Sequence, residues 1–97
     1  MLAALFLFLT ATLRWHANPA NPRGTTYDAY RRVGPCPPGP LHNTVEFKKL
    51  NTAAIDGTEF KDNTVQARQT YCYVVTAVPR GGGVQSVPSN DVQIVIP

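Results

Sequence analysis

The stretch Thr70-Tyr71-Cys72-Tyr73-Val74-Val75-Thr76-Ala77-Val78 decides the fold class of this chain. Most of its residues are aromatic or β-branched, the types that suit pleated strands. Inward positions recur at every second residue from Tyr71 to Ala77, which is the spacing of a strand with one buried face. Pro79-Arg80-Gly81-Gly82-Gly83 then ends the pattern, because proline and consecutive glycines interrupt a strand ladder. The sequence therefore predicts a strand over 70–78.

Similar short segments occur on both sides of this strand. The ten Val, three Ile and ten Thr of the chain favour strands over helices. Loops rich in Pro, Gly and Asn separate the segments, and helical apolar spacing is absent outside the N-terminus. The pattern predicts an all-β, two-sheet sandwich of about seven strands. Beyond 70–78, strands are expected over 10–17, 25–33, 45–50, 58–62 and 92–96.

Length and charge exclude several classes of protein. The chain has 97 residues, of which 43% are hydrophobic, enough for one core but not for a multidomain enzyme. Nine Lys and Arg against six Asp and Glu give a net charge of +3. These charges are few and scattered, so a nucleic-acid partner is not expected.

The apolar run Leu2 to Leu9 leaves two alternatives for residues 1–9: a strand, or the remnant of a signal or anchor segment. It is too short to span a bilayer, which needs about 20 apolar residues, and it lacks the basic start of a signal peptide. Between Leu2 and Trp15 there is no Gly, Pro, Asn or Asp to mark a turn. Both alternatives stay open, and a strand that continued without a turn into residues 10–17 would overhang the domain formed by 10–97 with its first half.

Four parts of the sequence resemble a fibronectin type III domain of the bacterial, secreted or cell-surface type. They are Ala11-Thr12-Leu13-Arg14-Trp15, Tyr27-Asp28-Ala29-Tyr30-Arg31, residues 64–78 and Ser86-Val87-Pro88-Ser89-Asn90. The resemblance covers about residues 10–97 and implies an immunoglobulin-like sandwich with fibronectin type III topology. It places Trp15 in the core and makes Tyr71 a tyrosine corner that bonds the backbone near Val65 and Arg68. The expected core is Leu13, Trp15, Tyr27, Phe60, Val65, Tyr71, Tyr73 and Val75.

The topology that this resemblance implies brings Cys36 and Cys72 to the same end of one sheet. Cys72 points away from the core because Tyr71 and Tyr73 take the inward positions. We expect a disulfide, and with it an oxidising, extracellular or cell-surface location; the alternative is two free thiols in a reducing compartment. A metal site is not expected, because neither cysteine has a CxxC partner and His16 and His42 are isolated.

The sequence offers no catalytic or cofactor-binding constellation. No pair of carboxylates has a spacing that brings them together, and the glycine run at 81–83 lacks the Gly-Lys-Ser/Thr ending of a phosphate-binding loop. The integrin-binding Arg-Gly-Asp motif of some animal family members is also absent. The carboxylates are Asp28, Glu46, Asp56, Glu59, Asp62 and Asp91.

Two features are candidate binding surfaces. One is a basic and aromatic patch at Tyr30, Arg31 and Arg32, beside Lys48 and Lys49; the competing interpretation is a solvated face whose lysines discourage edge pairing. The other is the loop of Arg80, Gly81, Gly82 and Gly83.

These features favour a non-catalytic extracellular module for adhesion, spacing or domain presentation. Its partner would be a protein, a polysaccharide or a neighbouring domain of a larger chain. One alternative is a structural subunit that self-associates when residues 2–9 add a strand to a neighbour. Another is the C-terminal part of a larger secreted enzyme.

Overall fold

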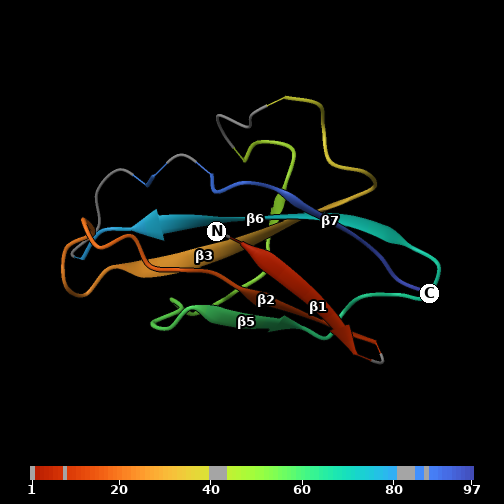
Figure 1. Cartoon of the computed structure of the whole chain (residues 1–97), viewed down its shortest axis with the longest axis horizontal. Helices are drawn as coiled ribbons and strands as arrows, with labels where there is room; N and C mark the ends of the chain where they lie inside the picture. The colour runs from red at the N-terminus through yellow and green to blue at the C-terminus, as the bar shows by residue number, and fades with distance from the viewer. Residues whose placement is uncertain (1, 8, 40–43, 81–84, 87) are drawn as a thin grey trace.

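The computed structural model describes residues 2–7, 9–39, 44–80, 85–86 and 88–97, and its strands form two antiparallel sheets (Figure 1). The three-stranded sheet has the order β1-β2-β5, and the four-stranded sheet has the order β4-β3-β6-β7. The fold is therefore an all-β sandwich. None of the described segments forms a helix of the length and apolarity that crossing a membrane requires. The strands are β1 (Ala3–Leu7), β2 (Thr10–Arg14), β3 (Thr26–Val33), β4 (Lys48–Lys49), β5 (Glu59–Asp62), β6 (Thr70–Val78) and β7 (Val92–Val95).

Strand β6 lies at the centre of the four-stranded sheet, as its alternating sequence predicts. It pairs with β3 over eight residues, from Thr26 opposite Val78 to Val33 opposite Tyr71. Its other edge pairs with β7 in its first half. Every residue from Tyr71 to Thr76 is buried, because both edges and both faces of this half of the strand are covered.

The N-terminal apolar run differs from the expectation. Strand β1 pairs antiparallel with β2, with Ala3 opposite Arg14 and Leu7 opposite Thr10. The chain therefore reverses between Leu7 and Thr10, and the overhang expected of a continuous strand was wrong. Reversal pairs backbone groups that an overhang would leave without partners. The start of β1 is fixed by Asn90, whose amide accepts from the Leu2 N–H (3.0 Å) and donates to the Leu2 carbonyl (3.3 Å).

Strand β4 is shorter than the sequence suggests. A strand was expected over 45–50, but only Lys48 and Lys49 pair with β3. The preceding residues turn instead, with the Phe47 N–H donating to the Thr44 carbonyl at 2.9 Å. Strand β4 therefore pairs with the edge of β3 over only two residues.

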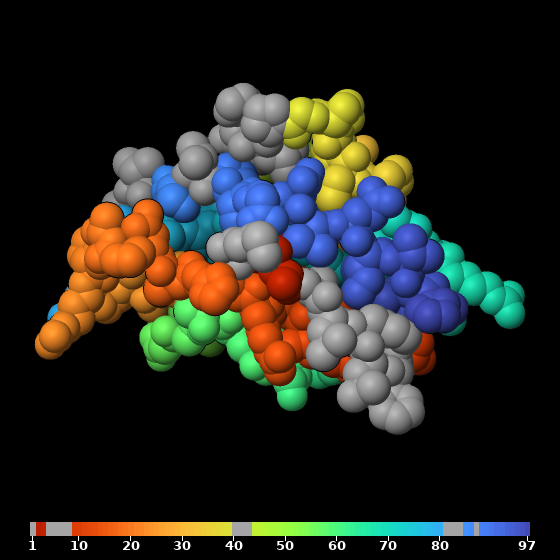
Figure 2. All heavy atoms as spheres, viewed as in Figure 1, coloured from red at the N-terminus to blue at the C-terminus, as the bar shows by residue number. Residues whose placement is uncertain are grey.

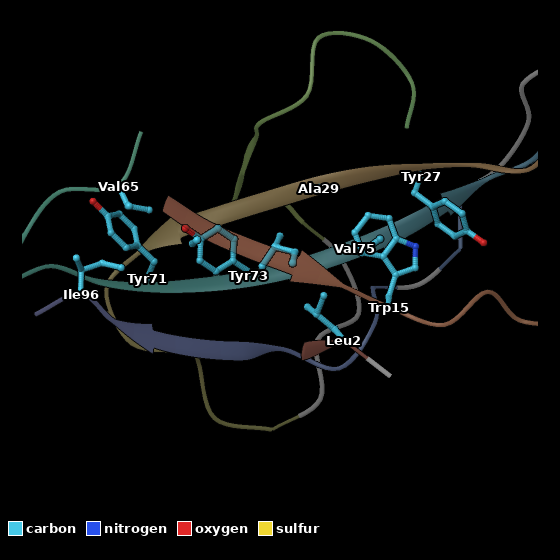
Figure 3. Close-up of a cluster of buried hydrophobic side chains, with 11 residues drawn as sticks. Leu2, Trp15, Tyr27, Ala29, Val65, Tyr71, Tyr73, Val75 and Ile96 are labelled. Atoms are coloured by element: carbon cyan, nitrogen blue, oxygen red, sulfur yellow. The ribbon is translucent and has the colours of Figure 1, made fainter. Parts of the chain in front are cut away.

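The core lies between the two sheets and is rich in aromatic side chains (Figure 3). Trp15 and Tyr27 meet edge to face, with ring centroids 5.4 Å apart. The Tyr71 hydroxyl accepts a hydrogen bond from the Gln66 N–H at 2.9 Å, which is the contact of a tyrosine corner. Of the expected core, Phe60 is half-buried, and the buried members are Leu13, Trp15, Tyr27, Val65, Tyr71, Tyr73 and Val75.

The outer face of the four-stranded sheet is also covered, by the β3–β4 connection and the segment before β7 (Figure 1). The disulfide between Cys36 and Cys72 ties the β3–β4 connection to this face, with the two Cα atoms 4.9 Å apart. The Cys36 N–H donates to the Gln93 side chain at 2.9 Å. The expected disulfide is thus confirmed, and the side chain of Cys72 is fully buried beneath the connection.

Candidate binding site

A recess of about 280 Å³ opens at the end of the sandwich where the β2–β3 loop and the segment 85–90 approach each other. Figure 2 shows the orange loop, the blue segment and the red start of the chain meeting on one face. Residues from four parts of the chain line the recess. They are Leu2, Trp15, His16, Asn18, Asn21, Tyr27, Val75, Thr76, Ala77, Ser86 and Ser89.

One wall is the β2–β3 loop, which is shaped by Asn18. The Asn18 side-chain oxygen accepts from the Ala20 N–H at 2.9 Å, and the Asn18 carbonyl accepts from the Asn21 N–H at 2.9 Å. The Asn18-Pro19 step favours this turn, because an asparagine side chain can bond the backbone two residues on while proline sets its own φ. The turn places Asn18 and Asn21 at the mouth of the recess.

The opposite wall is the segment that contains Ser86 and Ser89. Their hydroxyls accept from the N–H groups of Ala77 and Val75, each at 2.9 Å. Their own N–H groups donate to the Ala77 and Val75 carbonyls, at 2.9 and 2.8 Å. The two serines therefore satisfy both backbone groups of Val75 and Ala77, along the half of β6 that β7 does not reach. This wall is fixed by main-chain bonding.

The floor of the recess contains Trp15, the single tryptophan of the chain. Its side chain is held between the sheets against Tyr27, and the residue is 7% exposed. Its indole nitrogen is buried and has no hydrogen-bond partner among the described residues. In Figure 3 this nitrogen lies on the side of the ring that faces Tyr27.

The two loops also touch outside the recess, at Gly24 and Arg80. A Cβ at Gly24 would lie 2.7 Å from Cδ of Arg80. Gly24 also has a φ of +86°, a conformation that residues with a Cβ rarely adopt. Glycine is therefore required for the turn, and the Arg80 side chain packs against it.

A second cluster of polar groups lies between the sheets around Asp62, which is 3% exposed. Its Oδ2 accepts from the Tyr73 hydroxyl (2.7 Å) and the Arg31 guanidinium (2.9 Å). Its Oδ1 accepts from the Thr64 hydroxyl (2.6 Å) and N–H (3.0 Å). Arg31 also lies over the Tyr71 ring, 4.8 Å from its centroid. The cluster joins β3, β5 and β6 and leaves neither carboxylate oxygen unpaired.

These contacts shift two ionisation equilibria. Burial alone would raise the pKa of Asp62, but the hydrogen bonds from Thr64, Tyr73 and Arg31 outweigh it and hold this pKa below its ordinary value. Burial and the neighbouring Asp62 carboxylate raise the pKa of the Tyr73 hydroxyl far above its ordinary value. Asp62 is therefore a carboxylate and Tyr73 a neutral donor at neutral pH.

The buried Asp28 on the outer face of β3 is equally engaged. Its Oδ1 accepts from the Asn51 amide at 2.8 Å and its Oδ2 from the Gln85 amide at 3.1 Å. Gln85 Oε1 in turn accepts from the hydroxyls of Tyr30 and Thr76, both at 3.2 Å. The network fixes the segment before β7 to the sheet.

The residues proposed as a basic and aromatic patch do not form one surface. Tyr30 and Arg32 lie on the outer face of β3, where Tyr30 is buried against Gln85. Arg31 points to the opposite face and binds Asp62. Arg32 lies 3.9 Å from Glu46. Alternation along the strand therefore separates Arg31 from its two neighbours.

The structure describes only part of the second candidate surface, the loop that begins at Arg80. Arg80 is exposed and packs on Gly24, whereas Gly81, Gly82 and Gly83 lie outside the described residues, as does His42. Lys48 and Lys49 border a separate recess of about 340 Å³ beside Lys61 and Asp62.

Sequence reasoning missed the recess between the two loops. Its walls come from Asn18 and Asn21, in a loop between two expected strands, and from Ser86 and Ser89, which entered only through the family resemblance. The available signal was the pair of Asn-Pro steps at 18–19 and 21–22, which concentrates amide side chains in one loop.

One group of possible metal ligands lies close together in the described part of the chain. Atoms of Cys36, Cys72 and Asp91 lie within 4.8 Å of one another. Both sulfurs are in the disulfide, and a metal ligand of this type must be a thiolate. In this oxidised form the group does not fit a metal ion.

Among solved structures, the chain is similar to a Fn3-like protein from Clostridium thermocellum. The similarity covers 100% of this chain and 88% of that chain, with 26% sequence identity and a TM-score of 0.72. This chain has a fibronectin type III-like fold. No protein-family model and no curated protein matches its sequence. The fibronectin type III-like fold supports a non-catalytic module in general.

Proposed function

We propose that this fibronectin type III-like domain is a non-catalytic, extracellular binding module that presents the recess between its loops to a partner. The observation that carries the proposal is the location of the polar side chains that have no intramolecular hydrogen-bond partner. In the described part of the chain, the side chains of His16 and Asn21 make no hydrogen bond or ion pair, and both residues line this recess. Loops on a rigid sandwich commonly carry recognition.

The state of the buried carboxylates argues against catalysis. Each oxygen of Asp28 and of Asp62 accepts from at least one side chain. A general acid or base must reach a substrate proton directly or through one water. These two groups are committed to holding strands and loops together, so neither suits that role.

The disulfide supports an extracellular location. Disulfides persist mainly in oxidising compartments, and Cys36–Cys72 fastens the long β3–β4 connection onto the sheet. A cross-linked sandwich of this size suits adhesion or the presentation of neighbouring domains.

The proposal is tested by binding to displayed protein and glycan arrays, with the oxidised domain as the probe. The test variant is the double substitution Asn18→Asp and Asn21→Ala, at the recess. The matched control is Gln66→Ala, which removes an exposed amide at the opposite end. Signal that is lost in the double variant and kept in the control supports a module that binds through its recess. Turnover of glycan, peptide or ester substrates by the purified domain would contradict the proposal.

Two alternatives from the sequence stay proposals. Self-association through residues 2–9 is measured by sedimentation of the whole chain. Origin as the C-terminal part of a secreted enzyme is measured by the size of the protein in its native source.

A further inference from the structure

We propose that two copies of this chain associate in solution by pairing their β5 strands antiparallel, with Phe60 of one copy opposite Phe60 of the other. The occupant of the free β5 edge is therefore a second copy of the chain. This inference does not depend on the recess between the loops, and it uses a different strand from self-association through residues 2–9. It draws on the backbone groups of β5, the order of charges along the strand and the recess beside it.

The first argument is the direction of the backbone groups of β5, the last strand of the three-stranded sheet (Figure 1). The Trp15 N–H donates to the Thr58 carbonyl at 3.0 Å, so Thr58 turns its backbone groups toward β2. Because this direction alternates along an antiparallel pair, the backbone groups of Phe60 also face β2. Those of Glu59 and Lys61 face away, and no described residue bonds them. An edge of this kind is a template for a further strand.

The second argument is the order of the charges on this edge. With a two-fold axis at Phe60, Glu59 of each copy lies opposite Lys61 of the other. Each such pair exchanges two backbone hydrogen bonds, because these are the residues whose N–H and C=O groups face outward. Side chains that lie directly opposite each other share one face of the sheet, so each pair also places a carboxylate beside an ammonium group. The strand is complementary to itself in this register.

Neighbouring registers are disfavoured by charge or by hydrogen bonding. An axis at Glu59 sets two carboxylates directly opposite each other, and an axis at Lys61 does the same with two ammonium groups. An axis between two residues sets an outward-facing backbone group against one that faces β2. A lysine on an edge strand commonly prevents pairing. Here Lys61, which has no ion-pair partner among the described residues, is matched by an opposite charge when the axis lies at Phe60.

The third argument is the recess beside the edge. Its volume is about 340 Å³, and its apolar residues are Leu50 and the half-buried Phe60. Phe60 pairs with the core residue Leu13 of β2, so its side chain lies on the inner face of the sheet. Opposed residues that exchange no hydrogen bond have the closest side chains in an antiparallel pair. The two Phe60 rings therefore meet on the side of the recess and cover each other's exposed area.

Sedimentation equilibrium of the whole, oxidised chain, from about 10 µM to about 1 mM, tests the association. We expect the average mass to rise with concentration from the monomer mass toward twice that value. Hydrogen exchange at the same concentrations locates the contact. Exchange at the amides of Glu59 and Lys61 should slow as the concentration rises. Exchange at the Phe60 amide, which already faces β2, and at the β1 amides should be unchanged.

Exchanging the charges tests the register. Glu59→Lys sets lysine against lysine and Lys61→Glu sets glutamate against glutamate, so each variant alone should associate at least about tenfold more weakly. An equimolar mixture of the two variants restores both opposite-charge pairs and should associate nearly as well as the unaltered chain. The double variant also restores these pairs, at unchanged net charge. The control is Arg23→Glu, an equal change of charge on the exposed β2–β3 loop, which should associate normally.

Several outcomes would overturn the inference. Glu59→Lys also loses its contact with Arg14, so thermal unfolding checks its fold, whereas Lys61→Glu has no such contact to lose. The inference is overturned if the unaltered chain stays monomeric at about 1 mM, if Lys61→Glu associates as well as the unaltered chain, or if the mixture stays monomeric. Protection of the β1 amides in place of those of β5 would assign the association to residues 2–9 and would also overturn it. None of these outcomes affects binding at the recess between the loops, so the proposed function is tested separately.

Discussion

The hydroxyl of Tyr73 donates a hydrogen bond of 2.7 Å to Asp62, joining the two sheets of the sandwich. Tyr73 belongs to β6 and Asp62 to β5, and both side chains are almost completely buried. Arg31, on β3, donates to the same carboxylate oxygen. A polar link inside an otherwise apolar core therefore fixes how the sheets face each other.

We predict that Asp62 makes the fold sensitive to acid. Because its pKa is lower in the folded chain than its ordinary value of about 3.9, its stabilisation is present above about pH 4 and is lost as the pH falls through the folded pKa. Asp62→Asn should lower the free energy of unfolding by about 3 kcal/mol at neutral pH. The measurement is urea unfolding across the acid range, with the exposed Asp56→Asn as control. A difference between Asp62→Asn and the unaltered chain that does not shrink in acid would contradict this prediction.

Tyr73 should make the fold sensitive to alkali. Its hydroxyl has a raised pKa in the folded chain, so its contribution is complete below about pH 10 and declines above it, by up to about 1.4 kcal/mol per pH unit. Tyr73→Phe should cost about 1–2 kcal/mol at neutral pH through the lost hydrogen bond. The test is the midpoint of urea unfolding, measured about one pH unit below pH 10 and about one pH unit above it. Equal alkaline losses in Tyr73→Phe and in the unaltered chain would exclude this role for the hydroxyl.

The tyrosine corner is expected to stabilise the fold through its hydroxyl. Tyr71→Phe leaves the partly buried Gln66 N–H without its acceptor, at a cost of about 1–2 kcal/mol. Tyr27→Phe is the matched control, because that hydroxyl makes no hydrogen bond to the described residues, and its loss should be close to neutral. Thermal unfolding of the two variants provides the comparison. Similar effects of both substitutions would mean that the Tyr71 hydroxyl has no special role.

Removing the disulfide is expected to lower the free energy of unfolding by about 4 kcal/mol, because the bridge closes a loop with a sequence separation of 36. The pair Cys36→Ser and Cys72→Ala tests this by urea unfolding. A reductant should lower the midpoint of the unaltered chain and leave that of the double variant unchanged. Intact mass under non-reducing conditions should show two hydrogens fewer than the reduced chain. An unaltered chain that is indifferent to the reductant would be inconsistent with a structural bridge.

Asn90 is expected to control the exposure of β1. Asn90→Ala removes both bonds to Leu2, so hydrogen exchange at the β1 amides should accelerate while exchange in β6 is unchanged. A loosened β1 also offers an unpaired strand edge, which favours association between copies. Sedimentation at increasing concentration measures that association. Unchanged exchange in β1 would show that its pairing with β2 is sufficient without Asn90.

Much of the sandwich could be predicted from the sequence, because period-2 alternation gives both the location and the inward face of a strand. The segment around β6 is the clearest case, since Tyr71 and Tyr73 are both inward as expected. The disulfide could be predicted only from the topology that the family resemblance implies. Spacing alone does not bring Cys36 near Cys72.

The N-terminal hairpin could not be predicted from turn residues, because Leu9 stands where such a turn usually has Gly or Asn. Pairing with β2 decides the conformation there. The recess was missed for another reason: its walls come from two loops far apart in the chain, and local patterns carry no information on their approach. The orientation of Arg31, in contrast, could have been predicted from the sequence, because alternation along β3 already indicates that Arg31 faces away from Tyr30 and Arg32.

The close approach of Arg80 to Gly24 means that the β2–β3 and β6–β7 connections are in contact at this end of the domain. A library that randomises one of them, in the manner of scaffold engineering, would change the shape of both. Replacing Gly24 by any larger residue would force the Arg80 side chain to move, although the two residues are more than fifty positions apart in the chain. Diversification of this end should therefore keep Gly24 and vary the two connections together, as a single surface.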